Sequence, residues 1–358
     1  MRGYCEYIEK FRTDLHEISN MLKYRKEKRI MKFKIERRVM INFGIIGIGN
    51  IAHRVAKGIL SSEKASLYAV ASRDAVKAEN FKGKYCAEKA YGSYEELLND
   101  PQVDIVYICT PNALHYDQIM LCLSYKKHVV CEKPMVADEA QVRELFAEAR
   151  KQDCFLMEAE KTMFTSLNVK LKKVIAEGAI GTLRAIRAEY SNKVLGHIEK
   201  DHWVLGENMG GCTYDVGVYP ISFSHYFADA GIKELNTQAF GHPEFSCNFG
   251  MQADVIYENG VYAFLQSNWF YTPEHKGSAV LVGDLGYIEI PAFWKGTKAY
   301  LHRDGTAEEI SVEMASDFEG EVTHAAECVE AGLLESPVLG EEMSVRIIKV
   351  VEKATKSC

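Results

Sequence analysis

A short apolar strand that runs directly into a glycine-rich turn and a helix constrains the fold of this chain more than any other feature. The apolar run 43–46 leads into a Gly-x-Gly-x-x-Ala pattern that starts at Gly47 and ends at Ala52. In such a turn the first glycine permits the tight bend, the second lets the backbone approach a pyrophosphate, and the alanine lets the helix pack closely. The pattern therefore predicts a dinucleotide-binding turn at a helix N-terminus. We expect the cofactor to contact Gly47, Gly49, Asn50 and Ile51.

Apolar runs and helical patterns alternate over the next hundred residues. Strand-like runs cover 66–72, 104–109 and 128–132, and helical patterns cover 75–84, 93–98 and 115–123. Alternation of this kind predicts a doubly wound parallel sheet, whose strands are apolar nearly throughout because helices cover both faces. We therefore predict an α/β fold with an N-terminal Rossmann domain over residues 40–160.

The remainder of the chain, residues 161–358, shows a different order of elements. A helical pattern at 168–178 precedes strand patterns at 183–191, 236–240, 252–257, 263–269, 277–282 and 286–290, and helical patterns return near 323–331 and 343–354. Consecutive strands without intervening helices predict an open, mostly antiparallel sheet. We expect a C-terminal α+β domain that binds substrate, with its final helices packed toward the first domain.

The end of the second strand bears on the choice of cofactor. A carboxylate at this tip would hold the ribose 2′-hydroxyl of NAD, whereas an arginine nearby would accept the 2′-phosphate of NADP. Ser72 occupies the approximate tip and Arg73 follows it, which favours NADP. Asp74 keeps NAD open, since a shift of one residue would bring its carboxylate to the tip.

Two further strand ends supply candidates at the carboxyl edge of the sheet, where cofactors bind. The turn Thr110-Pro111-Asn112 precedes a helix that contains His115, and the next strand ends in Glu132-Lys133-Pro134. Because Pro134 disfavours helix at Lys133, the lysine is expected to be extended and to point into the cleft. Its ammonium can then donate a hydrogen bond to a substrate oxygen and lower the pKa of a neighbouring acid.

Asp215 and Tyr219 are the other catalytic candidates. They lie four residues apart after Gly210-Gly211, so a helix that opens at the glycines would place both on one face. An unperturbed tyrosine has a pKa of about 10, which the Lys133 cation is expected to lower. Tyr219 could then exchange a proton with the substrate oxygen while hydride moves at the adjacent carbon.

Taken together, these motifs resemble the glucose-fructose oxidoreductase / inositol dehydrogenase (Gfo/Idh/MocA) oxidoreductases. The matching pieces are the glycine turn, Thr110-Pro-Asn112 with His115, Glu132-Lys-Pro134, and Asp215-Val-Gly-Val-Tyr219. Met157-Glu-Ala159, Gly178-Ala-Ile-Gly181 and Glu335-Ser-Pro337 are most similar to the dimeric dihydrodiol dehydrogenase branch. The resemblance implies a cis Lys133–Pro134 bond, a catalytic group of Lys133, Asp215 and Tyr219, and a homodimer formed through the second sheet.

The expected reaction is hydride transfer between NADP or NAD and a sugar, cyclic polyol or related diol. His202 and Trp203 are candidates for the substrate pocket, since an indole face suits a sugar ring or an aromatic diol. After Ala159 the dihydrodiol branch often continues with an aromatic residue and then arginine, whereas this chain has Glu160-Lys161-Thr-Met163. This difference leaves the substrate open. A trans-dihydrodiol or D-xylose dehydrogenase is one alternative, and a non-catalytic NAD(P)-binding regulator is another.

Composition limits the other function classes. The net charge is −7, and it is uneven: the first forty residues are basic, and the remainder is acidic, which argues against nucleic acid as the main partner. No apolar run approaches the roughly 18 residues that cross a membrane. The ten cysteines form no CxxC pair and no metal spacing, so we expect reduced thiols, no metal site and a cytoplasmic protein. Residues 1–39 are expected to form a dispensable extension, either peripheral or disordered.

Overall fold

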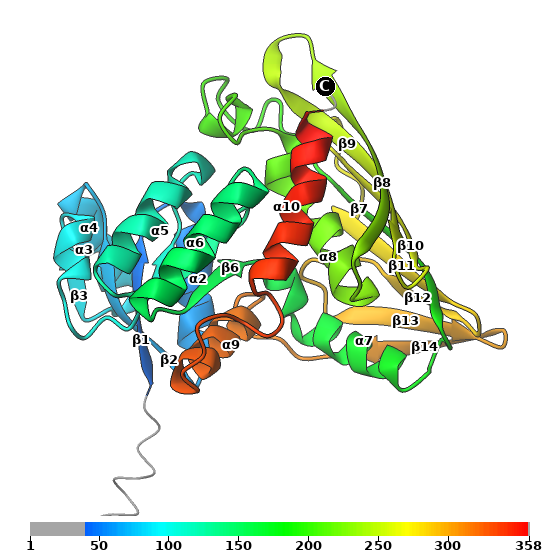
Figure 1. Cartoon of the computed structure of the whole chain (residues 1–358), viewed down its shortest axis with the longest axis horizontal. Helices are drawn as coiled ribbons and strands as arrows, with labels where there is room; N and C mark the ends of the chain where they lie inside the picture. Colours follow the sequence, from blue (N-terminus) through cyan, green and yellow to red (C-terminus); the bar gives the residue numbers. More distant parts are fainter. Residues whose placement is uncertain (1–39, 357–358) are drawn as a thin grey trace, which may run out of the picture. The chain divides into compact units, whose positions relative to one another are not determined.

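The computed structural model describes residues 40–356 and contains two sheets (Figure 1). The predicted extension, residues 1–39, lies outside the described residues. The first sheet is parallel, with six strands in the order β3-β2-β1-β4-β5-β6. Its strands are β1 (Ile41–Ile46), β2 (Ala65–Ala71), β3 (Lys89–Tyr91), β4 (Ile105–Ile108), β5 (His128–Glu132) and β6 (Leu156–Ala159). The predicted doubly wound sheet is confirmed, and its strand order reverses between β1 and β4, where such sheets bind ligands.

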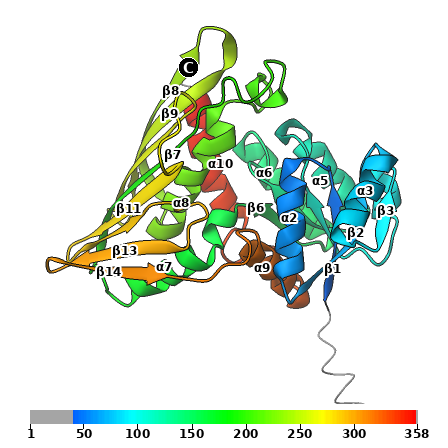
Figure 2. The ribbon, with the colours of Figure 1, turned by 180° about the vertical axis from the view of Figure 1, so that it is seen from behind.

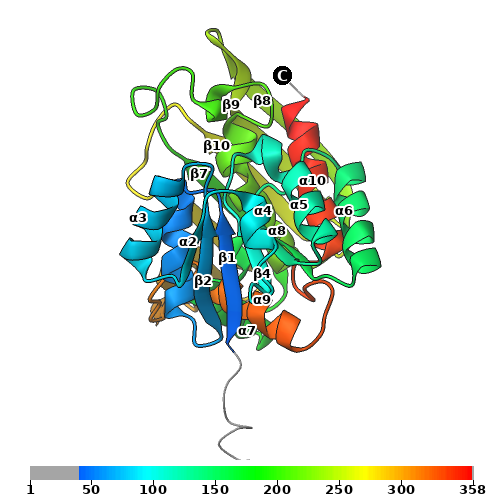
Figure 3. The same cartoon turned by 90° about the vertical axis from the view of Figure 1, so that its left-hand side faces the viewer.

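Helices cover both faces of this sheet. Figure 3 shows α2 (Asn50–Ser61) and α3 (Ala75–Tyr85) on one side, and α5 (His115–Ser124) and α6 (Glu139–Gln152) on the other. The short helix α4 (Tyr94–Leu98) lies between β3 and β4 in the chain. Strand β1 is buried along almost its whole length because it lies between β2 and β4 under these helices. The apolar runs in the sequence are the consequence of this double cover.

The glycine turn has the geometry that its sequence predicts. Gly47 has a φ of 86°, and a Cβ added there would lie 2.5 Å from Thr110 Cγ2, so the turn approaches the end of β4 more closely than a side chain allows. Gly49 is the N-cap of α2 and offers no side-chain cap, and the first turn of α2 contains no acidic residue. The N–H groups of that first turn therefore stay available for an anionic ligand.

The second sheet has eight strands in the order β14-β13-β12-β11-β7-β10-β9-β8. Only β7 and β10 pair in parallel, so the predicted mostly antiparallel sheet is confirmed. Its strands are β7 (Leu183–Ser191), β8 (Ile232–His242), β9 (Phe245–Tyr257), β10 (Tyr262–Asn268), β11 (Gly277–Gly283), β12 (Tyr287–Ile290), β13 (Lys298–Arg303) and β14 (Thr306–Ser311).

The sequence patterns identified six of these strands and missed β13 and β14. Strand β14 is exposed at every position except Ile310, and its neighbour β13 is buried only at Ala299. A strand with so little buried surface has no alternation of apolar and polar residues to detect in the sequence. Hydrogen bonds between backbones pair these two strands. Strands β8 and β9 also extend further than predicted because they form a long, twisted hairpin that projects at the edge of the sheet (Figure 1).

The later helices are α7 (Ser166–Ala176), α8 (Val218–Ala228), α9 (Glu319–Glu330) and α10 (Glu341–Thr355). Of these, α8 and α10 pack on one face of the second sheet, and α9 and α10 also contact helices of the first part. Every residue of α8 is buried, because this helix lies between the sheet and α10. Helix α9 packs against α2, and α10 packs against α6 and α8 (Figure 2). The C-terminal helices thus fix the second sheet beside the cofactor turn. Among residues 40–356, no helix is both long and apolar enough to cross a membrane.

Candidate active site

A cavity of about 730 Å³ follows the carboxyl edge of the first sheet. Most of the predicted cofactor contacts line it together: Gly47, Gly49, Asn50, Ile51, Ser72, Arg73, Thr110 and Pro111. The opposite wall comes from the second part of the chain and includes the predicted substrate residues His202 and Trp203. A cavity of this size is ample for a ligand of cofactor class, for which typical pockets hold about 300–1,000 Å³. The residues present therefore fit a dinucleotide along the glycine turn.

The end of β2 and the first turn of α3 present cations to this cavity. Arg73 and Lys77 both line it, and Lys77 was not predicted. The Asp74 carboxylate instead accepts a hydrogen bond from the Lys77 backbone N–H at 3.0 Å and caps α3. Asp74 does not line the cavity, because its side chain turns toward the backbone N–H groups in the first turn of α3.

A second cavity of about 350 Å³ adjoins the first and holds the predicted catalytic group. Lys133, Asp215 and Tyr219 all line it. The Lys133 ammonium donates a hydrogen bond to the Asp215 backbone carbonyl at 2.5 Å and lies 4.6 Å from the centre of the Tyr219 ring. The Lys133–Pro134 bond is cis, as the resemblance implied. The predicted Glu132 and Asn112 line the same cavity, while Ile51, Thr110 and Trp203 border both cavities.

Two details of this group differ from the sequence-based expectation. Asp215 and Tyr219 do not share one regular α-helix: a π-helical turn, Thr213–Gly217, contains Asp215, and α8 begins only at Val218. The turn leaves the Asp215 carbonyl available to Lys133, so the carbonyl rather than the carboxylate orients the ammonium.

The second difference concerns the pKa of Tyr219, which was expected to be lowered by Lys133. Burial raises the pKa of Tyr219 well above its usual value, and the Glu160 and Glu132 carboxylates raise it further. Lys133 makes a cation–π contact with the face of the ring. Tyr219 therefore keeps its proton at neutral pH and is suited to donate it. Burial likewise raises the pKa of the Asp215 carboxyl.

Behind Glu132 lies a pair of carboxyl groups that share a tyrosine. The Tyr107 hydroxyl is 2.6 Å from Glu321 Oε1 and 3.1 Å from Glu132 Oε1, and all three residues are buried. The hydroxyl donates toward both carboxyl groups, and the contact with Glu321 is the shorter of the two. Burial raises the pKa of both glutamates.

His115 lies behind the cavity wall and lines neither cavity. It is fully buried, with Nδ1 3.0 Å from the Pro134 carbonyl and Nε2 3.0 Å from the Thr110 carbonyl. The imidazole thus ties the ends of β4 and β5 together and supports the two turns that line the site. His202 has a local role as well, since its Nδ1 accepts a 3.3 Å hydrogen bond from the Val204 N–H at the start of a 3₁₀ turn, Trp203–Leu205.

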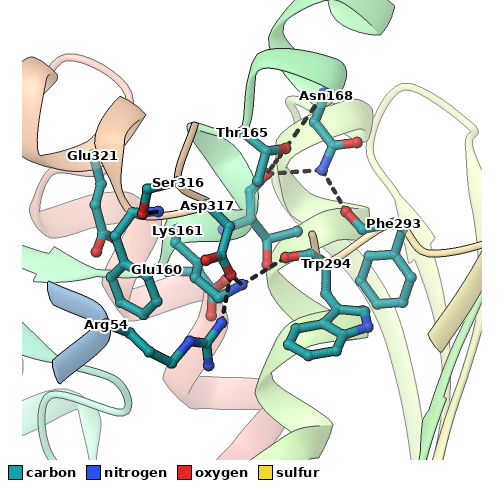
Figure 4. Close-up of polar contacts among 12 residues, drawn as sticks. Arg54, Glu160, Lys161, Thr165, Asn168, Phe293, Trp294, Ser316, Asp317 and Glu321 are labelled. Carbon is teal, nitrogen blue, oxygen red and sulfur yellow. Dashed lines mark hydrogen bonds and ion pairs between the residues drawn. The ribbon is translucent and has the colours of Figure 1, made fainter. Parts of the chain in front are cut away.

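A charged cluster borders the second cavity, and the sequence patterns did not identify it as a site. Figure 4 shows Arg54 and Lys161 converging on the Asp317 carboxylate, beside the Trp294 ring. Lys161 is almost fully buried and also donates to the Trp294 carbonyl at 2.7 Å. The sequence offered one signal, which is the replacement of the expected aromatic residue and arginine after Ala159 by Glu160 and Lys161. Arg54 and Asp317 are 263 residues apart, so no local pattern could join them.

Two family models match the chain. One describes an oxidoreductase family with an NAD-binding Rossmann fold and covers residues 41–160, and the other describes a GFO/IDH/MocA C-terminal domain and covers residues 168–289. Trans-1,2-dihydrobenzene-1,2-diol dehydrogenase from Mus musculus is 32% identical over 327 residues, with 88% of this chain and 96% of the relative aligned. The Xenopus tropicalis enzyme of the same name is 31% identical over 326 residues, with 87% of this chain and 96% of the relative aligned.

Solved structures with the same fold include a 3-ketoreductase and an aldose-aldose oxidoreductase. KijD10, a 3-ketoreductase from Actinomadura kijaniata crystallised with NADP and TDP-benzene, has a TM-score of 0.76 and 26% identity, over 87% of this chain and 96% of that chain. An aldose-aldose oxidoreductase from Caulobacter crescentus, complexed with glycerol, has a TM-score of 0.80 at 23% identity, over 89% of this chain and 97% of that chain, and this likeness concerns the fold alone.

Proposed function

The chain belongs to the GFO/IDH/MocA family of NAD(P)-binding oxidoreductases, and on that premise we propose that it is an NADP-preferring dehydrogenase or reductase of a sugar, cyclic polyol or related diol. The observation that supports this most strongly is the meeting of Lys133, Asp215 and Tyr219 in a cavity that adjoins the dinucleotide cavity. Membership of the family also confirms the predicted class of enzyme, a dehydrogenase or reductase. A non-catalytic regulator would not need these three residues to converge.

In the proposed reaction each side chain has one task. A bound nicotinamide supplies or accepts the hydride. The Lys133 ammonium, oriented by the Asp215 carbonyl, donates a hydrogen bond to the reacting oxygen of the substrate and stabilises negative charge there. Tyr219, which holds its proton, transfers it from its Oη to that oxygen when a carbonyl is reduced, and solvent then returns a proton to the phenolate. Oxidation of an alcohol runs through the same steps in reverse, so Tyr219 must first lose its proton to solvent before it accepts the proton of the alcohol. Trp203 and Trp294 provide ring faces on which a sugar can lie.

A screen of turnover tests this function. The purified protein would be incubated with NADP⁺ or NAD⁺ and aldoses, inositols or trans-dihydrodiols, and absorbance at the nicotinamide band would be followed. We expect turnover with at least one polyol class, and faster turnover with NADP⁺. Preference for dihydrodiols over all sugars would favour the alternative that the curated relatives suggest. Tight nucleotide binding without turnover on any class would favour the regulator.

Arg73 is proposed to set the preference for NADP. Charge-assisted hydrogen bonds contribute about 1.5–3 kcal/mol, so Arg73→Ala should weaken NADPH binding by roughly 10- to 150-fold while NADH binding changes little. Fluorescence titration of both reduced nucleotides measures the two constants. Asp74→Ala is the matched variant for the alternative. If it weakens NADH binding more than Arg73→Ala weakens NADPH binding, the carboxylate reads the ribose and the preference is for NAD.

We also propose a homodimer that forms through the outer face of the second sheet. No described helix packs on this face, Phe264 is 48% exposed there, and a hollow of about 400 Å³ is lined by Arg187, Glu189, Asp254 and neighbouring polar side chains. Two copies of such a face can bury the phenylalanines and pair the charges. Sedimentation should show a dimer, and Phe264→Glu should shift it to monomer. A monomeric wild type would contradict the proposal.

A cytoplasmic location stays a proposal. None of the eight cysteines in the described part of the chain forms a disulfide, and seven of them are buried, which suits a reducing compartment. Cell fractionation tests this location, and recovery of the protein outside the cytoplasm would contradict it.

A further inference from the structure

Arg54 extends from the cofactor helix α2 into the second cavity, one helical turn beyond Ile51. We infer that Arg54 selects a substrate that bears a carboxylate, so that the enzyme acts on a sugar acid rather than on a neutral sugar. The inference rests on the proposed function and narrows its substrate class. It is carried by the geometry of the guanidinium and by the charges around it.

The Arg54 guanidinium is held in place from behind but remains open toward the cavity. Its Nη2 lies 2.5 Å from Asp317 Oδ2, and its Cζ lies 4.8 Å from the centre of the Phe318 ring and 5.9 Å from that of Trp294. The side chain is nevertheless 38% exposed, and within residues 40–356 its other nitrogens form no hydrogen bond. Donors that are pre-positioned and unused in this way are those that a ligand can engage at little entropic cost.

The partner of Arg54 does not neutralise it. Asp317 Oδ2 also lies 2.6 Å from the buried Lys161 ammonium, so one carboxylate serves two cations. Burial lowers the pKa of Lys161 to about 8, which still leaves it mostly charged at neutral pH. The neighbouring Glu160 offsets only part of this charge, because burial raises its pKa to about 7. A net positive charge therefore remains at this wall of the cavity.

The rest of the cavity does not supply the missing anion. Lys133 and Lys276 add two more cations to the lining, and the acidic lining residues are Glu132 and Asp215. These two acids match only the two lysines, which leaves Arg54 without a counter-charge in the lining, and burial raises the pKa of both acids. A ligand carboxylate would balance the excess charge and would match the planar fork of the guanidinium with two parallel hydrogen bonds. A neutral polyol would satisfy the donors but not the charge.

Matched substrate pairs test the inference. With NADP⁺ or NADPH as required, kcat/KM would be measured for D-glucuronate against D-glucose, and for D-galacturonate against D-galactose. We expect the wild type to prefer each acid by at least about tenfold. Arg54→Met should lower kcat/KM for the acids by roughly 10- to 150-fold, as loss of a charge-assisted hydrogen bond predicts, and should affect the neutral sugars at least tenfold less. Arg54→Lys should recover only part of the loss, because it retains the charge without the fork.

Controls separate this effect from misfolding and from failure of the proposed function. Arg184→Met removes an exposed arginine from the second sheet and should change neither substrate class. If neutral sugars are turned over as well as the acids, or Arg54→Met lowers both equally, the inference is wrong although the proposed function stands. A sugar phosphate preferred over the uronate would overturn the carboxylate assignment.

A binding measurement decides the matter even where turnover is absent. Trp203 and Trp294 line the cavity, so quenching of tryptophan fluorescence in the NADPH complex reports occupancy by glucuronate or glucose. Tighter binding of glucuronate that is lost in Arg54→Met supports the inference. Equal binding of the two sugars, or binding of glucuronate that Arg54→Met leaves unchanged, overturns it.

Discussion

Replacing Lys133 by methionine should lower kcat by about 10²- to 10⁴-fold, the range expected when a positioned proton-transfer or charge-stabilising group is removed. The reason is its position: the ammonium is held by the Asp215 carbonyl beside Tyr219, and methionine keeps the length of the side chain without the charge. Affinity for NADPH should change far less, because the proposed cofactor contacts of the glycine turn and Arg73 line the larger cavity, which Lys133 does not line. Steady-state kinetics and a fluorescence titration of NADPH measure the two effects separately.

The control for this variant is Lys151→Met, which removes an exposed lysine from α6 and should leave kcat unchanged. A second variant, Tyr219→Phe, should also lower kcat strongly, because the ring remains while the transferable proton is lost. If Lys133→Met retains at least a third of the wild-type kcat, Lys133 is not part of the catalytic group. If it loses NADPH binding and kcat/KM together, its main role is to hold the cofactor.

Replacing Asp317 by asparagine should destabilise the protein by about 3–5 kcal/mol, since breaking a buried ion pair leaves an uncompensated buried charge. The residue left behind is Lys161, whose side chain is 3% exposed and whose remaining partner is the Trp294 carbonyl. Urea unfolding at pH 7 measures the loss. Lys161→Met should cost much less, because it removes the charge together with the need for a partner, and it should rescue much of the loss caused by Asp317→Asn.

The pH dependence of this loss has a defined sign. The pKa of Lys161 is about 8 in the folded protein, below that of an unfolded lysine, and removing Asp317 lowers it further. Below the folded pKa the buried ammonium destabilises the variant more than the wild type, whereas above about pH 8 both folded forms hold a neutral lysine. The difference between the two proteins should therefore narrow as pH rises from 6 toward 8 and should be largely lost above about pH 8. A constant difference between pH 6 and 9 would show that Lys161 is not the cause.

The sequence predicted the parts of this molecule that local chemistry determines. The glycine turn, the apolar strands of the first sheet, and the extended lysine before Pro134 each follow from residues that lie next to one another. The three catalytic candidates do meet in one cavity, although Lys133 and Asp215 are 82 residues apart, because the resemblance related both to one family site. Strand β14 was missed because it buries almost no apolar surface.

What the sequence did not predict depends on packing between distant segments. Tyr107 and Glu321 are 214 residues apart, and Glu321 reaches the end of β4 only because α9 packs beside the first sheet. The pKa of Tyr219 was predicted in the wrong direction because burial and the nearby Glu160 are tertiary properties. The same applies to His115, whose position in the sequence indicates the cavity edge but whose two hydrogen bonds place it behind the wall.

Tracing the hydride tests the central claim most directly. NADPH labelled with deuterium at the transferred position would be incubated with the carbonyl form of the best substrate from the screen, and the product would be examined by mass spectrometry. We predict one deuterium on the new carbinol carbon, at a rate that Tyr219→Phe and Lys133→Met both reduce. A product without deuterium would contradict hydride transfer from the cofactor, and equal rates of labelling by the wild type and both variants would contradict the assistance of Lys133 and Tyr219.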